Sequence, residues 1–202
     1  MNNKVTLPAI AILGALLFWI LFFWNPVVDK AVQHETLGLS ATPVGGDFTV
    51  EILNNDLALK DLRGKVVVLY FGYTQCPDIC PTSLALLTQA LSQMKEEELS
   101  GMQSIFVSVD PERDNTARLE EYVKYFHSNI IGATAEQDEI DRITKLYGAS
   151  YRIVESNSAM GYIVDHSSYT YIIDKKGKLR HTLPHATSSK EILKVVRELL
   201  AE

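Results

Sequence analysis

The chain of 202 residues contains two cysteines, and they lie four positions apart, at the two ends of the sequence CPDIC from Cys76 to Cys80. Two neighbouring thiols can take part in thiol-disulfide exchange or bind a soft metal ion. The usual redox spacing is Cys-x-x-Cys. The extra residue here widens the ring that a disulfide would close, and it also lets two thiolates converge on an ion. Two cysteines exclude a scaffold held by several disulfides and a metal site of four thiolates.

A histidine far downstream is a candidate third metal ligand. Two thiolates are too few to hold a metal ion tightly, so we expect a third soft or borderline donor. Of the five histidines in the chain, His166 differs from the others because it follows a loop rich in Ser, Asn and Gly and precedes a predicted strand. Its position is equally compatible with a ligand and with an ordinary histidine. Met160, in the same loop, is a conceivable extra donor, although packing explains it more simply.

The cysteines follow a segment that predicts a central strand. The run from Lys65 to Phe71 is continuously β-branched and aromatic, which is typical of a strand buried on both faces. A helix pattern follows from Pro81 to Leu99, and the free N–H groups at its start would stabilise a thiolate. Because Pro81 cannot donate a hydrogen bond to the carbonyl of Pro77, we expect the helix to begin at Pro81 after a turn.

The remaining segments predict one α/β domain. A hairpin is expected between residues 48 and 59, and strands then alternate with helices before a closing hairpin and helix. We expect further strands over residues 104–109, 170–173 and 179–182, and helices over 114–126, 137–147 and 188–200. A short apolar segment lies at 130–131, and the segment 151–154 follows the helix over 137–147. This order predicts a thioredoxin-like fold, a mixed sheet flanked by helices with an N-terminal hairpin.

The N-terminal segment predicts a transmembrane helix. Seventeen of the 20 residues from 5 to 24 are apolar, and no charge occurs between Lys4 and Asp29. Twenty helical residues span roughly 30 Å, the thickness of the hydrocarbon core. We therefore expect an uncleaved anchor over residues 1–28, a linker over 29–46 and the thioredoxin-like domain over 47–202. A cleaved signal peptide is the less favoured alternative. Lys4 places the N-terminus in the cytoplasm, which puts the domain on the periplasmic side of a bacterial inner membrane.

The charge balance excludes one class of partner. The chain carries 19 Lys and Arg against 25 Asp and Glu, a formal net charge of −6. An acidic chain offers no electrostatic footprint for a polyanion, so we expect no nucleic acid partner.

Three motifs together resemble the Sco/SenC family of membrane-anchored copper proteins. They run from Tyr70 to Pro81, from Val107 to Asp114 and from Val164 to Asp174. Gln75 departs from the family, in which this position is often His. The second motif, considered without the resemblance, is most simply a helix N-terminus with an acidic cap. The resemblance implies a thioredoxin-like fold in which Cys76, Cys80 and His166 bind copper.

The same resemblance implies a copper metallochaperone rather than an enzyme. Its copper would go to the binuclear copper site of cytochrome c oxidase subunit II, and further partners would be a periplasmic thiol reductase or another copper chaperone. Two thiolates and an imidazole suit Cu(I), although zinc would accept the same donors with a water. A Cys76–Cys80 disulfide has no thiolate to offer, so the thiols must be reduced before copper is loaded.

Two alternatives involve the cysteines without copper. A periplasmic thiol-disulfide oxidoreductase, acting on the cysteines of the oxidase or of other proteins, would need Cys76 and Cys80 but not His166. A peroxiredoxin-like peroxidase rests on fold analogy alone, and it is less favoured because both cysteines lie in one turn.

Overall fold

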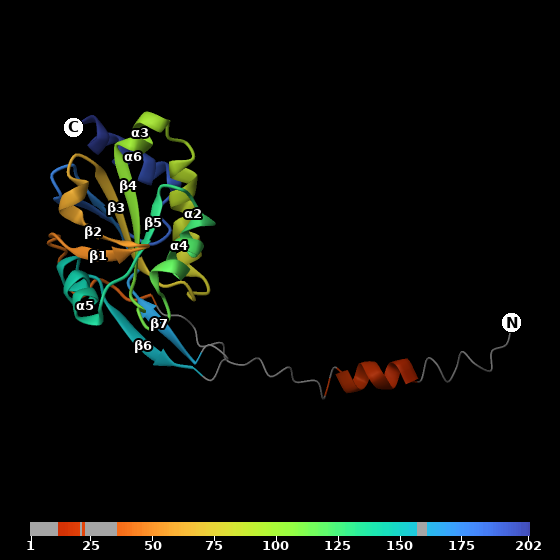
Figure 1. Cartoon of the computed structure of the whole chain (residues 1–202). Coiled ribbons are helices and arrows are strands. Elements are labelled where there is room, and N and C mark those ends of the chain that lie inside the picture. Colours follow the sequence, from red (N-terminus) through yellow and green to blue (C-terminus); the bar gives the residue numbers. More distant parts are fainter. Residues whose placement is uncertain (1–11, 21, 23–35, 157–160) are drawn as a thin grey trace. The chain divides into compact units, whose positions relative to one another are not determined.

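A mixed five-stranded sheet forms the centre of the fold. The computed structural model describes residues 12–20, 22, 36–156 and 161–202, and the chain divides into two compact units, Met1–Gln33 and His34–Glu202. The sheet lies in the second unit in the order β5-β4-β3-β8-β9 (Figure 1). Its strands are β3 (Val66–Gly72), β4 (Met102–Ser108), β5 (Ile130–Ala133), β8 (Thr170–Ile173) and β9 (Leu179–Leu183). Strands β3, β4 and β5 are parallel, β8 pairs antiparallel with β3, and β9 pairs antiparallel with β8, which confirms the predicted mixed sheet.

Strand β3 is buried along its whole length, as its apolar run predicts. Its side chains alternate between the two faces of the sheet. The ring of Tyr70 stacks on that of Phe106 on one face, with 6.2 Å between the ring centroids. Phe71 points to the other face and contacts Tyr147 and Tyr171 edge-on. Both faces therefore need a cover, and this explains why no polar residue interrupts the strand.

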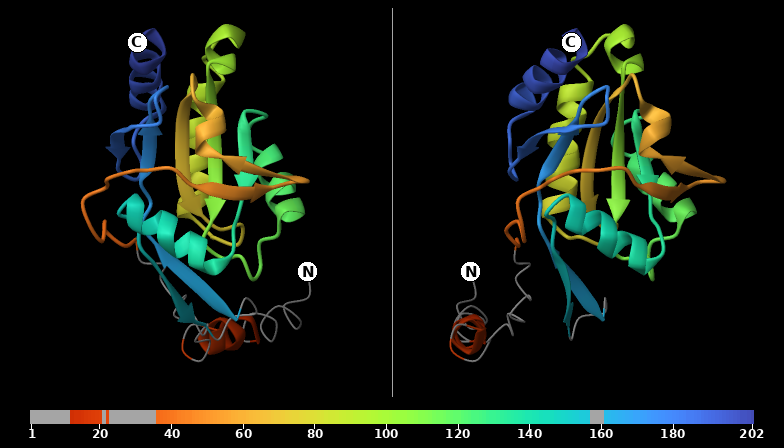
Figure 2. Two further views of the ribbon diagram at one scale, coloured as in Figure 1. Left: turned by 60° about the vertical axis from the view of Figure 1, so that its left-hand side comes forward. Right: turned by 90° about the vertical axis from the view of Figure 1, so that its left-hand side faces the viewer.

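Helices cover both faces of the sheet (Figure 2). One face carries α2 (Ile79–Leu91), α4 (Thr116–Lys124) and α6 (Ser189–Ala201). The other carries α5 (Gln137–Leu146) and the hairpin of β1 (Thr49–Ile52) and β2 (Asn55–Ala58), which confirms the predicted N-terminal hairpin. Two short helices, η1 (Leu59–Leu62) and α3 (Glu96–Ser100), precede β3 and β4.

Helix α2 begins at Ile79, two residues earlier than predicted, and ends at Leu91. Pro81 is its third residue, where an N–H group would have no acceptor within the helix in any case. The proline therefore does not delay the helix, and Cys80 lies in its first turn.

One strand was missed by the sequence pattern. β7 (Tyr162–His166) pairs antiparallel with β6 (Tyr151–Glu155) in a separate two-stranded sheet, with Tyr151 opposite His166. Only its first three residues, Tyr162 to Val164, favour a strand, and Asp165 and His166 shorten this signal. His166 is thus the last residue of a strand rather than part of a loop.

The transmembrane helix predicted over residues 1–28 is a wrong prediction. Residues 12–20 and 22 are helical. Within the described ranges, no helix is both long enough and apolar enough to cross a membrane. The rest of the predicted span, residues 1–11, 21 and 23–28, lies outside the described residues. The same finding corrects the predicted location, a single pass through a bacterial inner membrane.

The segment expected to be a linker, residues 29–46, is described from residue 36 onward. There its backbone bonds to residues at and after the end of α5. The N–H of Ser40 donates to the carbonyl of Gly148 (2.9 Å), and that of Val44 donates to the carbonyl of Leu146 (3.0 Å). The division at residues 28 and 46 stays a prediction.

Candidate metal centre

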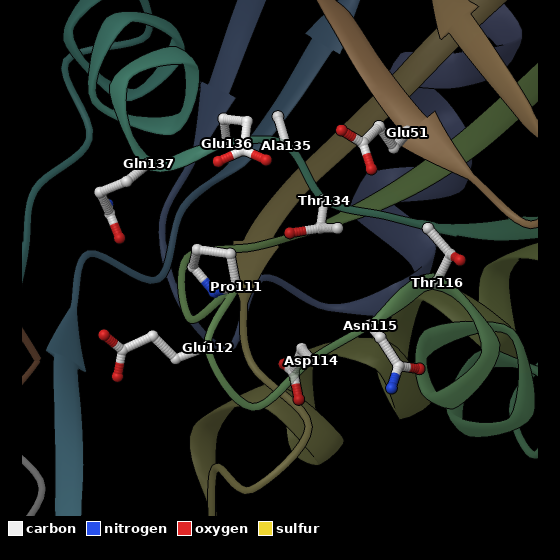
Figure 3. Close-up of a pocket in the computed structure, with 10 residues that line it drawn as sticks. All are labelled: Glu51, Pro111, Glu112, Asp114, Asn115, Thr116, Thr134, Ala135, Glu136 and Gln137. Atoms are coloured by element: carbon white, nitrogen blue, oxygen red, sulfur yellow. The ribbon is translucent and has the colours of Figure 1, made fainter.

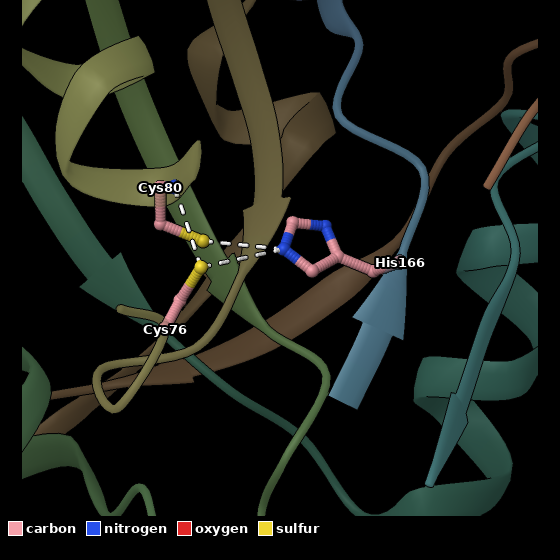
Figure 4. Close-up of side chains that lie close together, drawn as sticks. All are labelled: Cys76, Cys80 and His166. Carbon is pink, nitrogen blue, oxygen red and sulfur yellow. Dashed lines mark hydrogen bonds between the residues drawn. The ribbon is translucent and has the colours of Figure 1, made fainter. Parts of the chain in front are cut away.

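Both cysteines lie where β3 leads into α2 (Figure 4). Cys76 is in the connecting loop, and Cys80 is the second residue of the helix. The backbone N–H of Cys80 donates to Cys76 Sγ at 3.4 Å. This N–H is one of the first-turn groups that have no acceptor within the helix, and the positive end of the helix dipole lies there too. The start of α2 therefore stabilises negative charge on the Cys76 sulfur.

His166 reaches the two sulfurs from the end of β7. Its Nε2 lies 3.2 Å from Cys80 Sγ and 4.0 Å from Cys76 Sγ. One donor atom from each residue fits within a mutual distance of 4.8 Å, although His166 is 86 and 90 positions away in sequence. The structure thus brings together all three predicted site residues. In the part of the chain that the structure describes, this is the one such group of His, Cys, Asp or Glu.

The contact of His166 Nδ1 determines which ring nitrogen carries the proton and which has a free lone pair toward the sulfurs. Nδ1 lies 3.1 Å from the carbonyl oxygen of Ser167. Since a carbonyl only accepts hydrogen bonds, Nδ1 carries the proton in the neutral ring and Nε2 is left as a donor for a metal. Tyr70 and Tyr73 hold the ring edge-on, with ring centroids 6.4 and 5.9 Å away. The ring is therefore held in an orientation suited to metal binding.

Burial gives the two sulfurs different properties. Cys80 is 0% exposed and His166 1%, whereas Cys76 is 6% exposed. Burial raises the pKa of the Cys80 thiol well above its usual value, and its hydrogen bond with Cys76 raises this pKa further. Cys80 is therefore a neutral thiol at pH 7 until a metal ion displaces its proton. Cys76 is the sulfur that an incoming group meets first.

The spacing of the three donor atoms fits a three-coordinate ion. Bonds of about 2.0 Å to nitrogen and about 2.3 Å to sulfur, at 120° to each other, would separate N from S by about 3.7 Å. The two observed distances, 3.2 and 4.0 Å, lie on either side of this value. Shifts of about 0.5 Å or less would seat an ion. Two thiolates and an imidazole form a soft set, which Cu(I) prefers.

A buried carboxylate of the second motif holds the cysteine loop, a role that the sequence did not predict. Asp114 accepts hydrogen bonds from the backbone N–H of Thr74 (2.8 Å) and from its hydroxyl (2.5 Å). The hydroxyl of Ser108, at the end of β4, donates to the same carboxylate at 2.7 Å. Thr74 lies two positions before Cys76, so Asp114 positions the loop. The expected acidic helix cap is wrong, because Asn115 caps α4 through the N–H of Arg118.

The second motif also braces β7, the strand that carries His166. The Arg113 guanidinium binds Asp110 at 2.5 Å and donates to the carbonyl of Tyr162 at 3.0 Å, while the Tyr162 hydroxyl donates to Asp110 at 2.8 Å. On the neighbouring β3–α2 loop, the Tyr73 hydroxyl accepts from the N–H of Val164 at 3.2 Å. The sequence shows the charged and aromatic residues of this brace, but they lie in separate motifs. Which of them pair with each other cannot be assigned before the fold is known.

Asp165 lies next to His166 but serves a different contact. Its carboxylate accepts two hydrogen bonds from the Arg152 guanidinium of β6, at 3.0 and 2.9 Å. Neighbouring residues of a strand point to opposite faces, so Asp165 ties β7 to β6 while His166 faces the cysteines. Met160, the conceivable extra donor, lies outside the described residues.

Comparison with known proteins shows relatives for most of the chain. The family model described as SCO1/SenC matches residues 38–201, a range that includes Cys76, Cys80 and His166. The SCO2-like protein of Rickettsia felis is 36% identical over 160 residues, which cover 76% of this chain and 76% of that protein. The structure of Bradyrhizobium japonicum ScoI with copper bound is similar, with a TM-score of 0.71, 30% identity, and coverage of 78% of this chain and 99% of that one. Yeast Sco1 with copper bound gives a TM-score of 0.69 at 33% identity, over 79% of this chain and 90% of that one.

Proposed function

Because this chain belongs to the SCO1/SenC family, we propose that it is a copper metallochaperone that binds copper through Cys76, Cys80 and His166. The observation that carries the proposal is the convergence of two sulfurs and one imidazole nitrogen within 4.8 Å. Zinc would also accept these donors with a water. The copper-bound structures of two relatives favour copper.

The proposed recipient is the binuclear copper site of cytochrome c oxidase subunit II, in keeping with a family of cytochrome c oxidase assembly proteins. Transfer would proceed by ligand exchange. Each bond from copper to Cys76 or Cys80 is replaced by a bond to a thiolate of the partner, so Cu(I) keeps its oxidation state. Since Cys76 is the more exposed of the two sulfurs, the exchange begins there. A thiol reductase or another copper chaperone would restore the reduced, loaded form.

Thiol-disulfide exchange is the second candidate, and the proximity of two free cysteines favours it. In that function Cys76 attacks the disulfide of a substrate, and Cys80 then resolves the mixed disulfide. His166 has no part in these steps. The two functions therefore differ in their need for the histidine.

Copper binding by the reduced full chain, measured without oxygen against a chromophoric Cu(I) chelator, tests the proposal. We expect one Cu(I) per chain. His166→Ala should weaken binding more than about 100-fold, because loss of groups that only orient a ligand already costs about 10- to 100-fold. His127→Ala is the matched control. His127 is a half-buried histidine beside the amino ends of β4 and β5. The cysteines lie at the other end of the parallel strands, after the carboxyl end of β3.

Three results would contradict copper delivery. They are failure of the wild-type chain to bind copper at one per chain, equal affinities of His166→Ala and His127→Ala, and normal maturation of the partner by His166→Ala. Maturation that persists in His166→Ala together with intact disulfide exchange would favour the second candidate.

A further inference from the structure

A cavity lies beside the metal centre, at the carboxyl ends of β4 and β5. Its volume is about 440 Å³, and its walls are β1 and the loops that follow β4 and β5 (Figure 3). In open α/β sheets, ligands bind outside the carboxyl ends of the strands. The cavity shares one wall with the cysteine loop, because Asp114 lines the cavity and also binds Thr74.

The lining of this cavity is acidic. Of the ten described residues that line it, four are Asp or Glu and none is Lys or Arg; the acidic ones are Glu51, Glu112, Asp114 and Glu136. The three glutamates are exposed. In the described ranges, no ion pair joins any of these glutamates to a basic residue. Asp114 has Arg118 at 4.0 Å, but three exposed glutamates around one hollow without such a partner among the described residues attract a cation.

A buried hydroxyl in the same cavity has no hydrogen-bond partner among the described residues. Thr134 is 6% exposed, and its Oγ1 is buried without a hydrogen bond in the described structure. Glu51 and Thr134 form an antiparallel bridge, with N–H···O distances of 2.7 and 3.0 Å, so their side chains lie on one face. Figure 3 shows both polar groups on the cavity side. Because a buried hydroxyl without a partner costs free energy, a ligand that donates a hydrogen bond to it would gain affinity.

The geometry of the acceptors selects the kind of cation. The carboxylates do not converge as metal ligands do, since the one group of three close metal-ligating side chains in the described residues is the cysteine–histidine centre. A guanidinium presents five N–H donors in a planar fork, so it can reach separated carboxylates and a hydroxyl at once.

We propose that this acidic cavity binds an arginine side chain of a protein that docks over the metal centre. The cavity adjoins the loop of Cys76, the most exposed donor of the centre, so a protein that approaches Cys76 lies within reach of it. The bound guanidinium donates to Glu51 or Glu136 and to the Thr134 hydroxyl. This inference rests on the cavity alone and does not require copper binding.

The test is an NMR titration of the metal-free, ¹⁵N-labelled full chain with N-acetyl-arginine amide. N-acetyl-citrulline amide has nearly the same shape without the charge, and it is the control ligand. We expect saturable shifts of the Thr134, Ala135 and Glu136 amides with the arginine compound only. The Glu51→Gln/Glu136→Gln variant should weaken binding at least fivefold. Thr134→Val should weaken it about threefold without lowering stability, because the hydroxyl makes no hydrogen bond with any described residue.

A variant with equal charge change completes the design. Glu96→Gln/Glu97→Gln removes two exposed carboxylates from α3, which does not line the cavity, and it should bind the arginine compound like the wild type. Equal shifts with the citrulline compound, equal loss in the α3 variant, or stronger saturable shifts of the same amides with Ca²⁺ would each overturn the proposal. The readout uses metal-free protein, so it is independent of whether the chain binds copper.

Discussion

Replacing Gly72 with alanine tests whether the close packing around Cys80 positions the metal donors. Gly72 is the last residue of β3 and is buried. A Cβ atom at this position would lie 2.7 Å from Cys80 Sγ and 2.8 Å from Cε2 of Phe106. Ordinary contact begins at 3.4 Å, so the sulfur must move by about 0.7 Å, the difference between 3.4 and 2.7 Å. That displacement is larger than the roughly 0.2 Å tolerance of a metal–ligand bond length.

Two magnitudes follow from this displacement. Extra volume in a well-packed core destabilises a protein by about 1–3 kcal/mol, so the free energy of unfolding of Gly72→Ala should fall by that amount. A displaced donor should also weaken Cu(I) binding by about 10-fold or more, as loss of the groups that orient a ligand does. The variant therefore folds, but its metal centre is impaired.

The matched control is Gly132→Ala, on β5. A Cβ there would lie 2.7 Å from the backbone carbon and oxygen of Leu119, on α4, so the packing defect is at least as severe but does not involve Cys80. Urea unfolding and competition with a Cu(I) chelator would be measured for both variants. We expect both to lose stability and only Gly72→Ala to lose affinity. Wild-type affinity in Gly72→Ala, or equal loss in Gly132→Ala, would refute the reasoning.

Three further predictions follow from hydrogen bonds and protonation. Asp114→Asn replaces an acceptor oxygen with a donor NH₂ group, so one bond to Thr74 or Ser108 is lost; urea unfolding should show a loss of about 1–3 kcal/mol. Because burial raises the pKa of Cys80, Cu(I) must displace the proton of this thiol. Chelator competition from pH 6 to 8 should show an affinity for Cu(I) that rises about tenfold per pH unit for each proton released. An affinity that does not change with pH would contradict this. Burial, and next its bond to Asp110, raises the pKa of Tyr162 to about 12, and burial also raises that of Tyr70. These raised pKa values mean that the folded state keeps protons that the unfolded state loses near pH 10. Unfolding followed by circular dichroism should therefore show a constant contribution to the free energy of unfolding below about pH 10 and a decline toward pH 12.

Local patterns predicted those parts of the fold that neighbouring residues control. The apolar run of β3 reflects burial on both faces, and the N-terminal hairpin follows from two short strands around an asparagine-rich turn. The start of α2 was predicted two residues late, because Pro81 excludes a hydrogen bond only beyond the first turn. The predicted transmembrane helix is corrected, because no helix among the described residues is long and apolar enough to cross a membrane.

By itself, the sequence determined the chemistry available to this protein. Two cysteines at the start of a helix and one histidine before a late strand define a soft donor set, and those residue types are readable without a fold. Only the tertiary structure decided that His166 Nε2 lies 3.2 Å from Cys80 Sγ, because that distance depends on β7 pairing with β6 and on its braces to Asp110 and Tyr73. The same holds for the acidic cavity, whose walls come from three segments distant in the chain. Contacts between such segments form when the whole core packs, so no local pattern of residues contains them.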